Sequence, residues 1–338
     1  MEPKKRIIPV FVPHLGCPND CVFCNQRKIS GRLSPASAQT VEAELRSAAK
    51  KLPEGTPAEL AFYGGSFTAI PENEQEELLG AASPFLRSGL IDSIRVSTRP
   101  DCIDETVLAR LRRFGVGTIE LGAQSMDDDV LLLSGRGHTA EDTRAAAEKI
   151  KTAGFELMLQ MMTGLPGDTP EKSLYTAREL AALMPSGVRI YPTVIIRDTA
   201  LYDMWKAGLY KEHTVEDAVD LCARIVPVFE EKGIKIIRLG LNPTDDLSAG
   251  EAAAGAYHPA LGALVYSRIY LNKARELLRG HEGESLVVGV GRGKTPLFTG
   301  HKRENILALT REFSLRRLKV REEGSENGDI CILEIEKQ

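Results

Sequence analysis

Short apolar runs and longer helical patterns alternate along most of the chain. Apolar, largely β-branched runs predict seven strands, at Arg6–Val12, Glu59–Tyr63, Ser93–Thr98, Thr118–Leu121, Phe155–Met161, Val188–Ile196 and Lys235–Leu239. Apolar residues at helical spacing predict helices between them, at Ala38–Lys51, Glu72–Leu86, Glu105–Phe114, Ala140–Ala153, Pro170–Met184 and Val215–Lys232. Nearly continuous apolar strands alternating with helices are typical of a parallel sheet covered on both faces. The pattern therefore predicts an α/β fold, a full or partial βα barrel of the TIM type, with its chemistry at the carboxyl ends of the strands.

The pattern changes after Asn242. Residues 243–255 are rich in Asp, Ala and Gly, which predicts a linker or a long loop. Beyond them the sequence predicts two helices and three strands, at Ala263–Leu278, Lys302–Phe313, Leu286–Val290, Leu315–Val320 and Ile330–Ile335. We therefore expect a barrel domain over residues 1–242 and a small α/β accessory domain over residues 243–338.

Charge and hydropathy limit the partners that the chain can take. The net charge of −4 gives no overall attraction to nucleic acid or to an anionic membrane, so RNA binding needs a local basic patch. No segment approaches the roughly 20 apolar residues of a membrane span. Pro9 and Pro13 interrupt the apolar run near the N-terminus, which is also too short for a signal peptide. We expect a cytoplasmic protein without a membrane partner.

Three of the six cysteines are packed into one segment after the first predicted strand. Cys17, Cys21 and Cys24 have the spacing Cys-x3-Cys-x2-Cys. The other three are isolated and are expected to be small buried residues: Cys102, Cys222 and Cys331. Thiolates are the usual ligands of iron–sulfur clusters, and a cubane held by protein alone takes four of them. Three local thiolates therefore favour a 4Fe-4S cluster with one iron open to another ligand.

A structural zinc site is the main alternative for this triplet. His14 precedes Cys17 by three residues, and zinc sites with three cysteines and one histidine are common. Structural zinc is typical of small modules rich in loops, whereas this triplet lies at the predicted mouth of a large barrel. Cysteines without any metal are the remaining alternative. The pattern favours the cluster, with His14 as a loop residue near the site.

The triplet, with Phe23 before its last cysteine, resembles the signature of the radical S-adenosylmethionine (SAM) superfamily. Six motifs follow it in order, at Phe62–Thr68, Ser97–Asp101, Glu120–Ser125, Arg136–Thr139, Gly164–Gly167 and Ile190–Thr193. Together they resemble the radical SAM domain of the Elongator catalytic subunit and its bacterial relatives, over residues 6–240. The resemblance implies a 4Fe-4S cluster and SAM as cofactors. It also implies a mechanism in which SAM chelates the open iron, one electron cleaves the sulfonium, and a 5′-deoxyadenosyl radical abstracts hydrogen from a substrate. A one-electron reductant of the flavodoxin or ferredoxin type is the expected partner.

The resemblance also indicates SAM contacts at the ends of the second and third strands. Gly64 and Gly65 end one strand, where glycine lets the backbone approach the amino group of SAM. A plain turn between strand and helix is the alternative. Thr98 ends the next strand, in a stretch that usually begins with Glu in the Elongator group. Because Ser97 stands there instead, a carboxylate contact to SAM from this strand is in doubt.

Further candidates come from the later motifs. Gln124 is expected to contact ribose or adenine, or else to cap a loop, and Gly164 resembles the strand end near adenine. Arg136 is expected to pair with the SAM carboxylate, with an exposed arginine at a helix end as the alternative. His138 precedes the predicted helix N-cap and is interpreted as part of that helix start. Tyr191 is expected either to contact the substrate or to pack in the core.

The C-terminal region carries a weaker motif. Residues 289–295 resemble the end of a phosphate-binding loop, but Val288 stands where that loop requires glycine, so we expect no nucleoside triphosphate there. Residues 243–338 are also few for the acetyltransferase domain of full Elongator subunits. That family's complete reaction, carboxymethyl transfer to tRNA uridine, is therefore not carried over.

Three functions remain open from the sequence. The first is a radical SAM enzyme that acts on RNA, favoured by the seven basic and two acidic residues between Lys302 and Arg321. The second is a radical SAM enzyme on a small molecule of the coproporphyrinogen kind, although Phe23 and Asn25 occupy places where that group has tyrosine and cysteine. The third is a non-catalytic iron–sulfur or zinc module, which the missing fourth cysteine argues against. We favour the first, with tRNA as the expected RNA.

Overall fold

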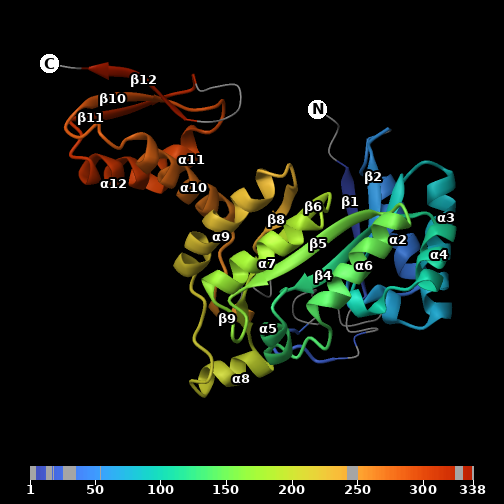
Figure 1. Ribbon diagram of the computed structural model, residues 1–338. Helices are drawn as coiled ribbons and strands as arrows, with labels where there is room; N and C mark the ends of the chain where they lie inside the picture. The colour runs from blue at the N-terminus through green and yellow to red at the C-terminus, as the bar shows by residue number, and fades with distance from the viewer. Residues whose placement is uncertain are drawn as a thin grey trace. The chain divides into compact units, whose positions relative to one another are not determined.

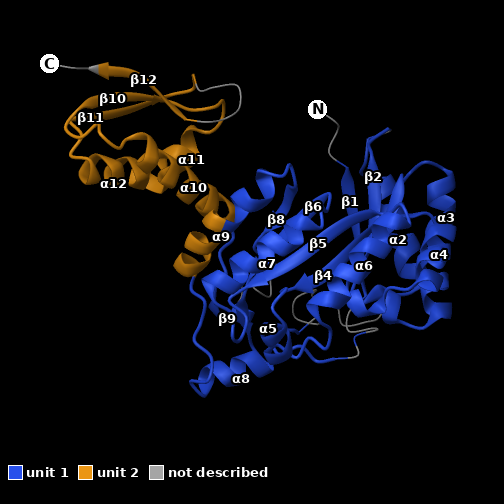
Figure 2. Cartoon of the chain, viewed as in Figure 1, with its two compact units in different colours: residues 1–214, 225–259 blue, residues 215–224, 260–338 orange. Residues whose placement is uncertain are grey.

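The computed structural model describes residues 5–12, 17, 19–25, 36–53, 55–241, 250–323 and 330–336. The chain forms two compact units, one of residues 1–214 with 225–259 and one of residues 215–224 with 260–338 (Figure 2). The domain boundary predicted between residues 242 and 243 lies outside the described residues. Each unit has its own sheet.

Seven parallel strands form the sheet of the first unit, in the order β1-β2-β3-β4-β5-β6-β8 (Figure 1). They are β1 (Arg6–Val12), β2 (Ala58–Gly64), β3 (Ser93–Thr98), β4 (Val116–Gln124), β5 (Glu156–Thr163), β6 (Gly187–Pro192) and β8 (Lys235–Leu239). Their order follows the chain, as right-handed crossovers through helices require. Because β1 and β8 are the two ends of this order, the sheet is open, and the partial form of the predicted TIM-type barrel is confirmed.

One hydrogen bond shows how strongly this sheet is curled. Arg189 on β6 donates to the hydroxyl of Tyr63 on β2 at 2.8 Å, although three strands lie between them. In a flat sheet, strands four places apart would be separated by about 19 Å, four times the usual spacing. The two side chains therefore meet across the concave face of a half-barrel.

Helices connect the strands and cover the convex face. They are α2 (Ala38–Ala49), α3 (Glu72–Arg87), α4 (Glu105–Arg113), α6 (Ala140–Thr152), α7 (Pro170–Ala182) and α9 (Val215–Glu230), of which residues 225–230 belong to this unit. Alternate strand residues such as Val10, Phe62 and Leu121 are fully buried beneath them. All six lie within two residues of the predicted bounds, and no helix in the described ranges is long and apolar enough to cross a membrane.

Four short elements of this unit differ from the prediction. They are α5 (Asp128–Leu133), β7 (Val194–Ile196), α8 (Ala200–Lys206) and β9 (Ala252–Gly255). The run 188–196, predicted as one strand, is divided after Pro192, and β7 leaves the barrel to pair with β9 in an antiparallel ribbon. The linker prediction is therefore wrong for residues 252–255. Their Ala-rich sequence has no strand preference of its own, and only pairing with β7 makes them a strand.

The second unit is a small α/β layer, as predicted. Its strands β10 (Ser285–Gly289), β11 (Arg317–Arg321) and β12 (Cys331–Glu336) form a sheet in the order β11-β10-β12. The helices α10 (Leu261–Leu277), α11 (Thr295–Thr299) and α12 (Glu304–Glu312) share one apolar core with it, which includes the fully buried Phe298. The helix predicted from residue 302 begins at Glu304, because Lys302 and Arg303 have left-handed backbone with φ of 47° and 64°.

Candidate functional site

The parallel topology brings five strand ends to one edge of the half-barrel. The cysteine segment follows β1, and Gly64, Thr98 and Gln124 are the last residues of β2, β3 and β4. Gly164 follows β5 directly. The cysteine segment and these predicted SAM contacts therefore share the carboxyl edge, where βα barrels carry their active sites.

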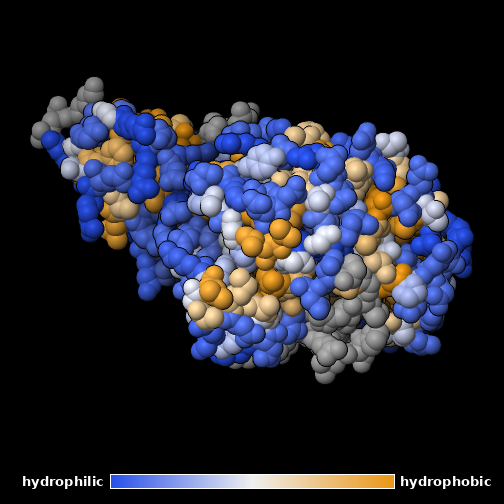
Figure 3. All heavy atoms as spheres, turned by 60° about the horizontal axis from the view of Figure 1, so that its bottom comes forward, coloured by the Kyte–Doolittle hydropathy of each residue, from blue (hydrophilic) through white to orange (hydrophobic). Residues whose placement is uncertain are grey.

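Two short elements anchor the cysteine segment. The backbone N–H of Val22 donates to Ser134, just after α5, and the carbonyl of Val22 accepts from Leu201 of α8 at 2.8 Å. Val22 and Phe23 pack against the apolar cluster of Ile195, Leu201 and Tyr210. Helix α5, beside the cysteine segment, exposes Leu132 and Leu133. Hydrophobic side chains gather on the face that Figure 3 turns forward. The unpredicted elements thus hold the segment that carries the cysteines.

Arg136 joins the cysteine segment to the end of β4. Its guanidinium donates to the carbonyl of Gly122 at 2.6 Å and to the Sγ of Cys21 at 3.5 Å. Its own carbonyl accepts from Arg99 at 2.6 Å, and Arg99 forms two further bonds to Asp101, both at 2.9 Å. Arg136 is 8% exposed, so the alternative of an exposed arginine is wrong. The following loop folds back over the strand end and buries the side chain.

Arg99 and Arg136 each have a buried N–H group that donates no hydrogen bond within the described structure. Nη1 of Arg99 and Nε of Arg136 are buried and have no hydrogen-bond partner among the described residues. No three metal-binding side chains are gathered in the described part of the chain. The donor set nevertheless fits an iron–sulfur cluster, because three thiols lie in one short segment beside buried cations. A cluster with thiolate ligands, and a carboxylate on its open iron, are anions that such cations would stabilise.

The glycines at this edge are required by close approaches of the chain. Gly64 has φ of 109°, and a Cβ there would lie 3.2 Å from the carbonyl oxygen of Val12, which also accepts from Gly65. Gly164 has φ of 73°, and a Cβ there would lie 2.4 Å from the ring of His213. The tight packing therefore accounts for both positions even before any ligand is considered.

The hydroxyl of Thr98 is already engaged within the fold. It lies 2.9 Å from the hydroxyl of Ser66 and 2.5 Å from that of Thr68. Thr68 donates in turn to the carbonyl of Cys102. This chain of hydroxyls ties the end of β3 to the turn after Gly64. Cys102 lies beside these hydroxyls and is half-buried, although it was expected to be buried. Elsewhere in the chain, Cys331 is also half-buried, whereas Cys222 is buried as expected.

Gln124 has a strained backbone that points its side chain into the half-barrel. Its φ is 65°, and the pairing of β4 with β5 shifts register between Gly122 and Gln124. Such a bulge re-aims a side chain. The amide oxygen of Gln124 accepts from Gln160 of β5 at 3.2 Å, and a Cβ on Gly122 would lie 2.9 Å from its Nε2. The side chains of Gln124 and Arg136 and the carbonyl of Thr98 thus lie around Gly122.

His138 belongs to this site as well as to the helix start. The predicted capping box forms between Thr139 and Asp142, but His138 itself is only 5% exposed and its Nε2 lies 3.2 Å from the carbonyl of Ala123. Burial, followed by the positive charges of Arg136 and Arg99, lowers the pKa of His138 to about 4. The imidazole is therefore neutral at pH 7.

The half-barrel has a charged interior that was not predicted from the sequence. Glu59, Arg95, Glu120 and Arg189 form ion pairs on the concave face: Arg95 to Glu59 at 2.7 Å, Arg95 to Glu120 at 3.6 Å and Arg189 to Glu120 at 2.9 Å. The available signal was one charged residue inside each of four otherwise uncharged strands, since charged side chains are rarely buried unless they are paired. Tyr191, noted from the sequence, is part of this group through Arg189 at 3.4 Å.

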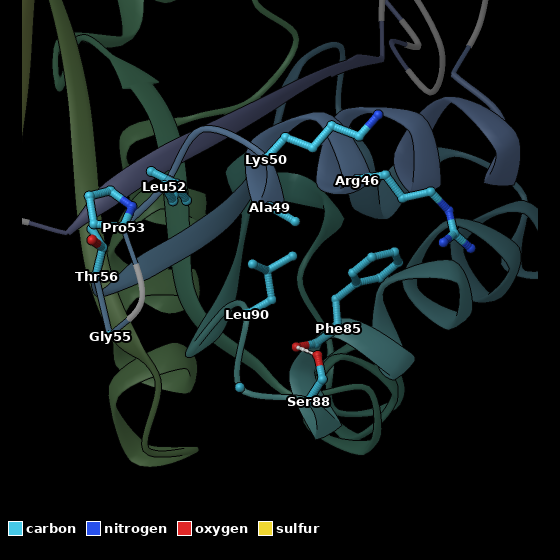
Figure 4. Close-up of a pocket in the computed structure, with 11 residues that line it drawn as sticks. Arg46, Ala49, Lys50, Leu52, Pro53, Gly55, Thr56, Phe85, Ser88 and Leu90 are labelled. Carbon is cyan, nitrogen blue, oxygen red and sulfur yellow. Dashed lines mark hydrogen bonds between the residues drawn. The ribbon is translucent and has the colours of Figure 1, made fainter.

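A hollow of about 700 Å³ lies at the opposite edge (Figure 4). Its walls come from the C-terminal ends of α2 and α3 and from the loops that lead into β2 and β3, with Phe85 and Leu90 between Arg46 and Pro53. These loops enter the amino ends of the strands. The hollow is therefore separate from the candidate site.

Comparison with known proteins agrees with this geometry. The profile of the radical SAM superfamily matches residues 11–180, and that of the radical SAM C-terminal domain matches residues 185–270. Elongator complex protein 3 of Schizosaccharomyces pombe is 33% identical over 50% of this chain and 35% of its own length. The tRNA uridine(34) acetyltransferase of Methanocaldococcus infernus is 32% identical over 53% of this chain and 33% of its own. The matched part of the chain thus spans about a third of these two relatives.

Solved structures share the fold. The archaeal Elp3 of Methanocaldococcus infernus superposes with a TM-score of 0.63 at 22% identity, over 85% of this chain and 71% of that one. Methylornithine synthase superposes with a TM-score of 0.51 at 14% identity, over 72% and 73% of the two chains. The superfamily profile covers half of this chain, including the cysteine triplet and the strand ends around it. This chain therefore belongs to the radical SAM superfamily, and is an enzyme whose cofactors are a 4Fe-4S cluster and S-adenosylmethionine.

Proposed function

We propose that this radical SAM enzyme modifies tRNA, with the cluster on Cys17, Cys21 and Cys24. When bound, the cluster supplies the electron that cleaves SAM. The finding that carries the assignment of the site is the position of Arg136, between the Sγ of Cys21 and the end of β4. A flavodoxin or ferredoxin of the cytoplasm is the reductant that we propose.

The residues at the carboxyl edge would then hold SAM. Arg136 has an unused Nε, through which it would bind the SAM carboxylate, and the carbonyl groups near Gly64 and Gly65 would accept from the amino group. Gln124 would contact the ribose or the adenine, with Gly164 close to the adenine. Thr98 would support them through its bonds to neighbouring hydroxyls, because its own hydroxyl is engaged.

Support for an RNA substrate comes from the second unit. Arg317, Lys319 and Arg321 alternate along the edge strand β11, while Leu318 between them is buried in the core with the helices. Since α10, α11 and α12 lie on one side of this sheet (Figure 1), the three basic residues, which alternate with Leu318 and Val320, face the other side. Arg321 is paired with Glu334, which leaves the exposed Arg316 and its neighbours for phosphates.

The relatives point to the same substrate. One of them is a tRNA uridine(34) acetyltransferase by name. A basic stripe along an edge strand suits the phosphates of RNA, because each neutralised phosphate releases counterions. Uridine in tRNA is therefore the target that we propose.

Filter binding of total tRNA tests this proposal. Replacing Arg316, Arg317 and Lys319 with glutamate should weaken binding and make the slope of log K against log salt shallower by about two to three, roughly one for each lost phosphate contact. The matched control replaces Arg279, Arg292 and Lys294, exposed cations of the same unit, with glutamate.

The outcomes separate the open functions. Binding that falls steeply with salt in the wild type and the control, but not in the triple variant, supports RNA. Absent binding at low salt, or equal loss in both triple variants, refutes it and leaves the small-molecule substrate.

A further inference from the structure

The concave face of the half-barrel is unusually polar for the interior of a βα fold. Interiors of full barrels are packed mainly with branched apolar residues. Here Glu59 of β2, Arg95 of β3, Glu120 of β4 and Arg189 of β6 form a continuous chain of ion pairs. All four side chains are at most 13% exposed, so the chain closes the bottom of the concave face. Even paired, buried charges often stabilise a fold no more than apolar residues of the same volume, so stability alone does not account for this chain of ion pairs.

Arg189 of this chain contacts two tyrosines near the carboxyl edge. Its Nε lies 2.9 Å from a carboxylate oxygen of Glu120, an ion pair without hydrogen-bond geometry. Its Nη2 donates to the hydroxyl of Tyr63 at 2.8 Å, and its Nη1 lies 3.4 Å from the hydroxyl of Tyr191. The guanidinium also lies over the ring of Tyr63, 5.3 Å from its centroid. One planar cation thus orients two tyrosines from strands on opposite sides of the half-barrel.

The two hydroxyls have hydrogens left to donate. Each accepts from the arginine, and neither has an acceptor for its own O–H within the described ranges. Both residues are partly exposed. Burial, with the charge of Glu120 next, raises the pKa of Tyr63 to about 12, and burial also raises that of Tyr191. Both phenols therefore stay protonated at neutral pH.

Tyr63 and Tyr191 lie on the concave face, close to the carboxyl ends of their strands. Tyr63 directly precedes Gly64, and Tyr191 is the register partner of Met162, one residue before the last residue of β5. A group that enters the concave face past the carboxyl edge would come within reach of these hydroxyls. Only a hydrogen-bond acceptor satisfies two O–H donors held side by side.

We propose that Tyr63 and Tyr191, oriented by Arg189, are the donor pair that positions the target base of the substrate through one of its ring carbonyl oxygens. The inference rests on the proposed function, since it takes uridine as the target. It assigns the positioning of the base to the chain's concave face rather than to the residues that hold SAM or to the basic strand of the second unit. Arg189 acts as a positioning residue, because it touches the base only through the tyrosines.

Carbon-13 NMR of the reconstituted protein, labelled at the phenol carbon of its eight tyrosines, tests this directly. Tyr63→Phe and Tyr191→Phe each remove one signal and so assign it. Tyr175→Phe, an exposed tyrosine on α7, is the matched control. The probes are uridine and two analogues that each carry hydrogen in place of one ring carbonyl oxygen.

We expect uridine to shift the Tyr63 and Tyr191 signals together. One of the two analogues should bind about threefold to tenfold more weakly, which corresponds to the loss of one neutral hydrogen bond. Tyr63→Phe should weaken the affinity for uridine, measured on the Tyr191 signal, by a similar factor. Tyr175→Phe should leave this affinity unchanged.

The outcomes distinguish this inference from the proposed function. If tRNA binds the basic strand but neither tyrosine signal responds to tRNA or uridine, the inference is wrong and the proposed function stands. If tRNA does not bind but uridine shifts both signals, the RNA substrate is wrong and the donor pair stands. If neither probe binds, or if both analogues match uridine, the donor pair is overturned.

Discussion

Replacing Arg189 with methionine is expected to destabilise the first unit strongly. The side chain of Glu120 is 3% exposed and loses its ion pair with Arg189. Among the described residues, Arg95 at 3.6 Å is then the cation that still pairs with it. Breaking a buried ion pair by removing one partner costs about 3–5 kcal/mol, because the other charge stays buried. Since Arg95 still compensates part of this charge, we expect a loss near 3 kcal/mol.

A second substitution isolates the cause. Glu120→Gln in the Arg189→Met background removes the stranded charge, so the double variant should regain about 1–2 kcal/mol relative to the single one. A loss that came from packing alone would show no such recovery.

Urea unfolding followed by tryptophan fluorescence measures the effect in the right unit. Trp205 is the chain's single tryptophan, and it packs against the apolar cluster beside the cysteine segment. Arg178→Met, at an exposed position on α7, is the control and should change stability by less than about 0.5 kcal/mol. A loss below that value for Arg189→Met, or a double variant less stable than the single one, would refute the account of the charged interior.

Three further predictions test the carboxyl edge. Arg136→Ala should lower the free energy of unfolding in urea by about 1–3 kcal/mol, because the buried carbonyl of Gly122 loses its donor. It should also weaken SAM binding in equilibrium dialysis. If neither quantity changes, Arg136 does not belong to the site. Gly164→Ala should cost about 2–4 kcal/mol, because its Cβ meets His213, whereas Gly208→Ala, with φ of 72° and open space around it, should cost only about 1–2 kcal/mol; equal losses would contradict the packing argument. The pKa of His138, about 4 in the folded chain against 6.5 unfolded, means that below pH 6.5 only the unfolded chain takes up this proton, so stability falls as pH drops towards 4. Wild-type protein should lose about 2 kcal/mol more than His138→Gln between pH 7 and pH 5, and parallel pH profiles would show that His138 is not buried neutral.

The strand and helix periodicity predicted most of the barrel. Strands β1, β3 and β8 have the predicted bounds, because the apolar runs and the turn residues beside them define where each strand begins and ends. The elements that anchor the cysteine segment escaped prediction for the opposite reason. Helix α8 is seven residues long, and β9 is a strand only through its pairing with β7, so both depend on contacts far along the chain.

The candidate site was predictable only in part. The spacing of the three cysteines and the strand-end positions of Gly64, Thr98 and Gln124 could be read from the sequence. The burial of Arg136 and His138 could not, because it depends on how the loop after α5 folds back over β4. The contact between Arg189 and Tyr63 depends on the curl of the whole sheet, which local patterns do not encode.

Reductive cleavage of SAM tests the central claim most directly. Protein reconstituted with iron and sulfide under anaerobic conditions should bind about four irons per chain. After reduction with dithionite, chromatography should show 5′-deoxyadenosine formed from SAM, and Cys24→Ala protein treated in the same way should form none. Stoichiometric zinc without sulfide, or no more 5′-deoxyadenosine than in the Cys24→Ala control, would contradict the account of this chain as a radical SAM enzyme.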